Sequence, residues 1–162
     1  MRFIKTPLLF FMILSIVSCS KDDDNVNNTD EDNTEIVNDN NSISDQILEL
    51  INKHRESAGL TSLVKNETAK QLCIDHTKYM ISIEKINHDN FGKRADVLKE
   101  TEKANSIAEN VASFYPDAQS VVAAWLNSSG HKNNIEGDYT HTGIASIKDE
   151  KGNYYYTQIF YR

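Results

Sequence analysis

The chain has 162 residues, a length typical of one domain with short appendages. Its formal net charge is -7, and the 25 residues from Lys21 to Asp45 alone contribute nine acidic side chains and one lysine. The remainder lacks the basic excess of a nucleic-acid-binding domain, so we expect no nucleic-acid partner.

Residues 1–18 have the composition of a secretory signal peptide. Arg2 and Lys5 form a short positive region, and Pro7 to Val17 is a nearly continuous apolar run that is short for a membrane span. The run ends in Ile-Val-Ser-Cys, which resembles the lipobox of bacterial lipoproteins. That resemblance implies cleavage before Cys19, lipidation of its thiol and the membrane as a partner. The alternative is a cysteine that closes an ordinary signal peptide or an N-terminal anchor.

Residues 19–44 predict an acidic, disordered tether. They are rich in Asp and Asn, and Val26, Ile36 and Val37 are their only large apolar residues before Ile43, too few to offset the entropy of ordering the chain. The Lys-Asp-Asp-Asp run after Cys19 resembles export tags that send some Gram-negative lipoproteins to the outer surface, and a solvated spacer is the alternative. We therefore expect a lipid-anchored protein of the cell envelope, at the outer membrane or its outer surface.

Residues 45–162 predict one α+β domain. Apolar residues at helical spacing and turn signals between them predict helices first and an antiparallel hairpin last. The fourth helix is expected to begin at Pro116 and to end at the turn-forming residues 128–130. Helices are expected over 45–57, 66–83, 93–103 and 116–127, and strands over 105–114, 142–148 and 154–161. This order favours helices packed on a small antiparallel sheet.

Three polar stretches each carry one ionisable group that could do chemistry: His88, Glu109 and His131. Two imidazoles and a carboxylate suit a divalent metal such as zinc, or acid–base work near neutral pH. Each residue also has a structural explanation. His88 could cap a helix or face solvent, Glu109 could be a buried, hydrogen-bonded carboxylate, and His131 could cap the preceding helix.

The order of the motifs resembles the CAP superfamily, also called the SCP or cysteine-rich secretory protein/pathogenesis-related 1 domain, in its bacterial form. The resemblance covers residues 47–160 and rests on these stretches: LINKHRESAGLTSL (50–63), NHDNFGKR (87–94), AENVA (108–112), WLNSSGHKNNI (125–135), YTHTGIA (139–145) and YYYTQIFY (154–161). It implies a three-layer α-β-α sandwich with a small antiparallel sheet and a cavity lined by two histidines and acidic residues.

The resemblance maps the cavity histidines onto His88 and His131 and one acidic residue onto Glu109. Trp125, Ser128 and Asn134 are expected to support the site. Many animal and plant members have a second glutamate where this chain has Ser128, which weakens a mechanism that needs two carboxylates. Cys73, His54 and His76 lie on apolar helix faces and are expected to pack in the core.

Three functions follow as hypotheses. The leading one is a lipid-anchored, extracytoplasmic protein that binds a ligand in a His/Glu-lined cleft: a metal ion, a lipid or sterol-like molecule, or a cell-envelope component. The second is a metal-dependent, peptidase-like hydrolase in which Zn or another divalent metal is held by His88 and His131, and Glu109 is the general base. The third is a surface interaction module without chemistry.

Overall fold

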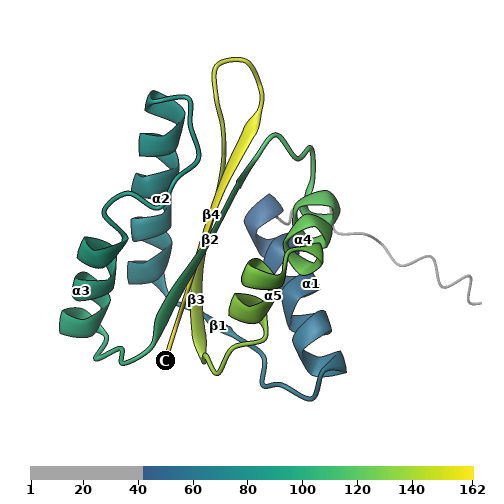
Figure 1. Ribbon diagram of the computed structural model, residues 1–162, viewed down its shortest axis with the longest axis vertical. Coiled ribbons are helices and arrows are strands. Elements are labelled where there is room, and N and C mark those ends of the chain that lie inside the picture. The colour runs from purple at the N-terminus through teal and green to yellow at the C-terminus, as the bar shows by residue number, and fades with distance from the viewer. Residues whose placement is uncertain (1–41) are drawn as a thin grey trace, which may run out of the picture. The chain divides into compact units, whose positions relative to one another are not determined.

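A computed structural model describes residues 42–162 (Figure 1). The predictions for the signal peptide (1–18), for lipidation of Cys19 and for nearly all of the tether (19–44) fall outside this range. The described elements are α1 (Ile43–Ser57), β1 (Val64–Lys65), α2 (Glu67–Ser82), α3 (Phe91–Thr101), β2 (Ile107–Ser113), α4 (Ala118–Asn127), α5 (Ser129–Ile135), β3 (His141–Lys148) and β4 (Tyr154–Tyr161). Among the helices of this part of the chain, none has the length and apolar character needed to cross a membrane.

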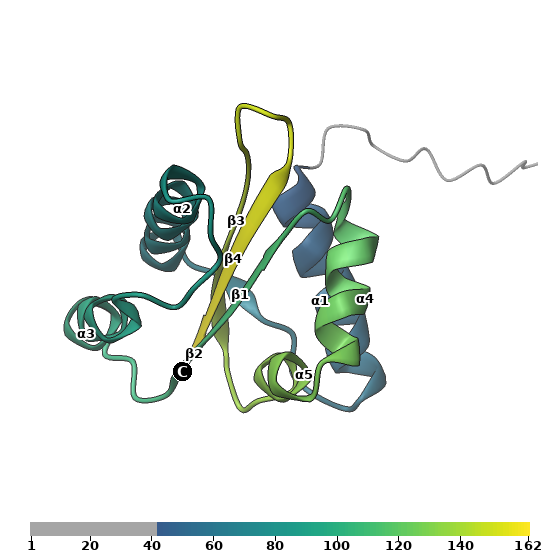
Figure 2. The same ribbon diagram turned by 45° about the horizontal axis from the view of Figure 1, so that its top comes forward.

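The four strands form one sheet in the order β1-β3-β4-β2. The last strand, β4, pairs antiparallel with both β3 and β2, whereas the two-residue β1 pairs parallel with the start of β3. Helices α2 and α3 cover one face of the sheet, and α1, α4 and α5 cover the other (Figures 1 and 2). The predicted α+β class and the three-layer α-β-α sandwich are therefore confirmed.

Two large apolar clusters and a small third one hold the layers together. On one face Ile47 and Ile51 of α1 and Trp125 of α4 pack on the sheet, and on the other face Ala69, Cys73 and Leu98 do so. Strand β4 serves both clusters, because Tyr156 and Phe160 belong to the first and Ile159 and Tyr161 to the second. Period-two alternation thus makes β4 the centre of the core.

Two helices begin at other residues than predicted because side-chain caps set their starts. Ser42 caps α1 by accepting a hydrogen bond from the Asp45 N–H, so α1 begins at Ile43 rather than at residue 45, and α4 begins after Asp117 rather than at Pro116. Asp117 accepts from the Ser120 N–H at 2.7 Å, and the Ser120 hydroxyl accepts from the Asp117 N–H at 3.4 Å, which is a reciprocal capping arrangement.

Two elements were not predicted at all. The stretch after Ser128, expected to be a turn, is the seven-residue helix α5, which starts as soon as α4 ends. Residues 64–65, for which no strand was predicted, form β1 because they pair with His141 and Thr142. Both elements depend on contacts with residues far along the chain.

The buried side chain of Arg55 joins α1 to the segment after α5. It is 2% exposed and donates four hydrogen bonds to carbonyl oxygens, those of Thr61, Ile135, Gly137 and Tyr139. His54, predicted to be a core residue, is instead half-buried and lies 2.8 Å from the Glu136 carboxylate. Arg55 and His54 together fix the position of α5 beside the sheet.

Candidate functional site

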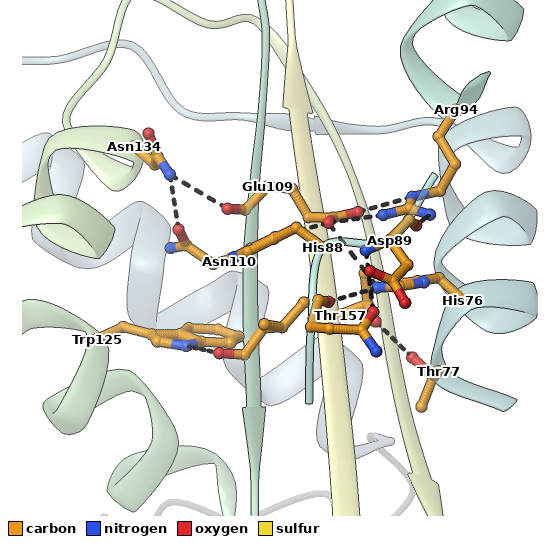
Figure 3. A network of polar contacts seen from close by, with 12 residues as sticks. His76, Thr77, His88, Asp89, Arg94, Glu109, Asn110, Trp125, Asn134 and Thr157 are labelled. Carbon is orange, nitrogen blue, oxygen red and sulfur yellow. Dashed lines mark hydrogen bonds and ion pairs between the residues drawn. The ribbon is translucent and has the colours of Figure 1, made fainter. Parts of the chain in front are cut away.

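Strand β2 is one edge of the sheet, and its residues 109 and 110 point to opposite faces. The Glu109 side chain points toward α2 and α3, and the Asn110 side chain points toward α5, as Figure 3 shows. This follows from the alternation of side chains along a strand. Glu109 and Asn110 therefore connect the helices of both outer layers to the same edge.

Arg94 holds the Glu109 carboxylate in a two-point contact. The Arg94 Nε donates to Glu109 Oε2 at 2.8 Å, and the Arg94 Nη2 donates to Oε1 at 2.7 Å. The Glu109 side chain is 1% exposed, so water contributes little to its solvation. Charge-assisted, bidentate contacts of this kind are the strong ones, and they fix the orientation of the carboxylate.

His88 is the third member of this network. Its Nδ1 lies 2.8 Å from Glu109 Oε1, and the side chain, which lies on the loop between α2 and α3, is 52% exposed. Because an ionised carboxylate only accepts hydrogen bonds, the Nδ1 atom carries the proton. In the neutral ring, Nε2 is then the free acceptor. A buried Arg–Glu pair thus orients an accessible imidazole.

Side chains of α2 and α3 fix the loop that carries His88. His76 of α2 is buried, and its Nε2 lies 2.8 Å from the Asn87 carbonyl oxygen. The Arg94 Nη1 donates to the Asp89 carbonyl at 2.7 Å, and the Tyr79 hydroxyl donates to the Asp89 carboxylate at 2.9 Å. Burial lowers the pKa of His76, which favours its neutral form. The residues on both sides of His88 are therefore anchored.

His131 lies on α5, at the other side of the same edge. It is half-buried, and burial, together with the nearby His88, lowers the pKa of its imidazole. Its carbonyl oxygen accepts a hydrogen bond from the Asn110 side chain at 3.2 Å. Within residues 42–162 the His131 ring itself makes no hydrogen bond, so its nitrogens are unused by the fold.

Side chains of α4 and α5 bind the free edge of β2. The Asn134 amide donates to the Glu109 carbonyl at 3.2 Å and to the Asn110 side-chain oxygen at 2.9 Å, and the Trp125 indole N–H donates to the Val111 carbonyl at 3.4 Å. Ser128 is the residue between α4 and α5, in extended conformation. Trp125 and Asn134 thus contact the strand that carries Glu109.

Sequence reasoning did not single out Arg94, His76 or Asn110 as site residues. A signal was available for Arg94, because a carboxylate inside an apolar segment requires a partner and Arg94 follows His88 in the same motif. His76 was assigned to the core, and its burial is confirmed. Its contact with the loop before His88 depends on the three-dimensional packing.

The described residues do not fit the zinc site that the resemblance implied. Within residues 42–162 no group of three or more His, Cys, Asp or Glu side chains is arranged to hold a metal ion. Both Glu109 oxygens already accept hydrogen bonds from Arg94, and one also accepts from His88. Protein zinc sites use three or four such ligands, and the two imidazoles alone fall short of that number.

Comparison with known proteins identifies the family. The family model described as "CAP: Cysteine-rich secretory protein family" matches residues 48–160, which is more than half of the chain. The chain belongs to the CAP family. The matched range contains every residue of the candidate site, from His76 to Asn134, so the site lies wholly within the CAP domain.

The similar proteins are either longer than this chain or only distantly related to it. The uncharacterized membrane protein YlbC of Bacillus subtilis (strain 168) is 34% identical over 119 residues, which are 71% of this chain and 33% of YlbC. An extracellular protein containing an SCP domain from Bacillus anthracis has a TM-score of 0.64 and 27% identity, covering 74% of this chain and 40% of that one. An outer surface protein from Borrelia burgdorferi has a TM-score of 0.64, 23% identity and coverage of 72% and 89%, and it shows the shared fold. This chain spans about a third of YlbC.

Proposed function

We propose that this CAP domain binds a polar cell-envelope component, such as a lipid headgroup, at the edge of β2 through His88 and His131. The observation that supports this most directly is the His88–Glu109–Arg94 network. Stability alone does not explain it, because a buried ion pair replaced by apolar side chains often costs nothing. Here the buried pair orients an exposed ring whose second nitrogen has no hydrogen-bond partner among residues 42–162. We also propose that the ligand binds in a cleft lined by His88, Glu109 and His131.

The two imidazoles suit a ligand with hydrogen-bonding groups. In its neutral form the His88 ring offers an acceptor at Nε2, and the half-buried His131 ring offers one donor and one acceptor. The lowered pKa of His131 favours the neutral form at neutral pH. Hydroxyl and amide groups therefore match this pair.

We place the protein outside the cytoplasm, held by lipid on Cys19 at the outer membrane. The lipobox-like stretch at residues 16–19 supports this, and the described CAP domain starts after a stretch long enough to act as a spacer. Labelled palmitate should enter the wild-type chain and not Cys19→Ala in growing cells. Equal labelling of the two would contradict the anchor.

Binding can be tested by NMR of the five histidine rings. The probes are a muropeptide, a short-chain phosphatidylglycerol and a soluble sterol ester. We expect at least one probe to shift the His88 and His131 signals and to leave the His54 signal in place. The double variant His88→Ala plus His131→Ala should lose this binding, and His54→Ala is the matched control. Binding that survives the double variant would contradict the proposed site.

A second candidate, hydrolysis, is favoured by the contact between Glu109 and His88. A carboxylate that orients an imidazole is a common arrangement for a general base. The geometry supports His88 as that base and Glu109 as the positioning group, because the Glu109 oxygens are occupied by Arg94 and His88. Incubation with peptide, ester and peptidoglycan substrates tests this, and turnover that is unchanged in His88→Ala would exclude His88.

A further inference from the structure

Among residues 42–162, the opposite edge of the sheet, at β3, is only partly covered. Strand β1 pairs with His141 and Thr142 and goes no further, because the chain turns away at Asn66 into α2. The Asn66 N–H donates to the Thr142 carbonyl at 2.9 Å, which shows that Thr142 directs its backbone polar groups toward β1. Backbone groups alternate along a strand, so those of Ile144 and Ser146 point the same way, beyond the end of β1.

A cavity of about 400 Å³ lies over this uncovered edge. Its floor is β3 from Thr142 to Ile147. Leu48 of α1 lines one side and Ile74 of α2 the other, and residues 65–67 close the end at which β1 stops. Figures 1 and 2 show α1 and α2 on opposite faces of the sheet, so the cavity lies between the two helical layers.

The edge lies at the bottom of a groove rather than on the surface. Thr142 is 1% exposed and Ile144 is 7% exposed, and the backbone of α2 is pressed against Gly143. Another folded sheet could not reach this edge between the two helices, whereas a single extended chain is thin enough. Backbone N–H and C=O groups in such a position require hydrogen-bonding partners. An extended polypeptide supplies them at the spacing of a strand.

The charges around the groove are balanced. Lys65 pairs with Asp45, and Lys70 pairs with Glu67. The rim therefore favours neither an acidic nor a basic ligand, while Leu48 and Ile74 offer apolar contacts to side chains that alternate toward the two walls. Uncharged, β-branched side chains fit this pattern, because they combine apolar surface with a preference for extended backbone.

We propose that this groove binds a short, uncharged, extended peptide segment of a partner protein. The segment adds to the sheet in line with β1, and its backbone pairs with Ile144 and Ser146. This peptide site lies at the edge opposite His88 and His131 and is independent of the function proposed for them.

The test is an NMR titration of the mature full-length chain with a pooled library of capped pentapeptides made of Ala, Val, Ile, Thr and Ser. The best binder is then resynthesised with N-methyl groups at alternate residues, in the two possible sets. We expect the amide signals of Ile144 and Ser146 to shift. One methylated set should bind about tenfold or more weakly because it loses backbone hydrogen bonds, and the other should bind nearly as the parent does.

Substitutions on α2 provide the matched control. Lys70→Trp places a large ring on the wall of the groove and should abolish binding, whereas Lys78→Trp, on an exposed part of α2 outside the groove, should leave it unchanged. Any of five results would overturn the proposal. Three concern the peptide titration: no binder in the pool, equal weakening by both methylated sets, or shifts confined to β2. Binding seen only after deletion of residues 22–41 would assign the groove to this chain's own segment. Loss of binding in His88→Ala plus His131→Ala would place the peptide at the other site.

Discussion

Three ionisable side chains at the β2 edge depend on one another, and Glu109 is the residue between them. Replacement by Gln keeps the size and removes the charge that Arg94 needs. Because Arg94 is buried, we expect Glu109→Gln to lower the free energy of unfolding by about 3–5 kcal/mol. Urea denaturation measures this, with Asp96→Asn on the exposed side of α3 as control. A loss below about 1 kcal/mol would show that water replaces the carboxylate at Arg94.

The histidines make stability depend on pH. Burial lowers the pKa of His76, and burial together with His88 lowers that of His131, from an ordinary value of 6.5. Between the lowered value and the ordinary one, the unfolded chain binds more protons than the folded chain. The free energy of unfolding therefore falls as the pH is lowered below about 6.5, and the contribution of both rings is complete above it.

Unfolding in urea at pH 7.5 and at pH 5.5 measures this effect. His76→Gln retains a hydrogen-bond donor for the Asn87 carbonyl and does not titrate, so its stability should fall less than that of the wild type between the two pH values. An equal fall in both proteins would show that His76 does not contribute.

Helix α2 packs closely against strand β3, and a substitution at Gly143 tests this contact. A methyl group at Gly143 would lie 2.2 Å from backbone atoms of Ala69 and Lys70. A helix backbone cannot yield as a side chain can, so Gly143→Ala should destabilise the protein by about 1–3 kcal/mol or more. Gly92→Ala is the control, because that glycine lies in α3 with nothing within 4 Å, and there alanine should be neutral or stabilising. Equal thermal stabilities of the two variants would contradict the close packing.

The elements that could be predicted are those whose own residues specify them. The long helices follow from apolar spacing, and β3 and β4 from alternating apolar residues around a turn. Helix α5 could not be predicted because its first residues favour turns and Ile135 is its only buried residue. Strand β1 has two exposed residues and forms only by pairing with β3.

The same distinction applies to the candidate site. His88, Glu109 and His131 could be selected as ionisable residues in polar stretches, and the family resemblance grouped them. The sequence could not show that Glu109 is already bound by Arg94, because this contact joins α3 to an edge strand. The expected roles of Glu109, as a metal ligand or as a general base, both assumed a free carboxylate.

At the scale of the whole molecule, Arg55 holds together segments that are about 80 residues apart. Its four carbonyl contacts fix the end of α5 and the entry to β3. Lysine has a single nitrogen and cannot reproduce them, so Arg55→Lys should lower the free energy of unfolding by about 3 kcal/mol, at roughly 1 kcal/mol for each lost hydrogen bond. Thermal denaturation of Arg55→Lys beside Lys53→Arg, an exposed change on α1, measures this. Similar melting temperatures would contradict the role assigned to Arg55.

The final strand, β4, occupies the interior of the sheet, between β3 and β2. Strand β2 ends some 40 residues before β4 begins. Among the described residues, β2 therefore has no strand partner until β4 has been made. Contacts between segments so far apart in the sequence make folding slow. Here the pairing of β2 with β4 also cannot form before β4 has been synthesised. A chain that emerges N-terminus first from a ribosome or a secretion channel cannot complete this domain until β4 has emerged.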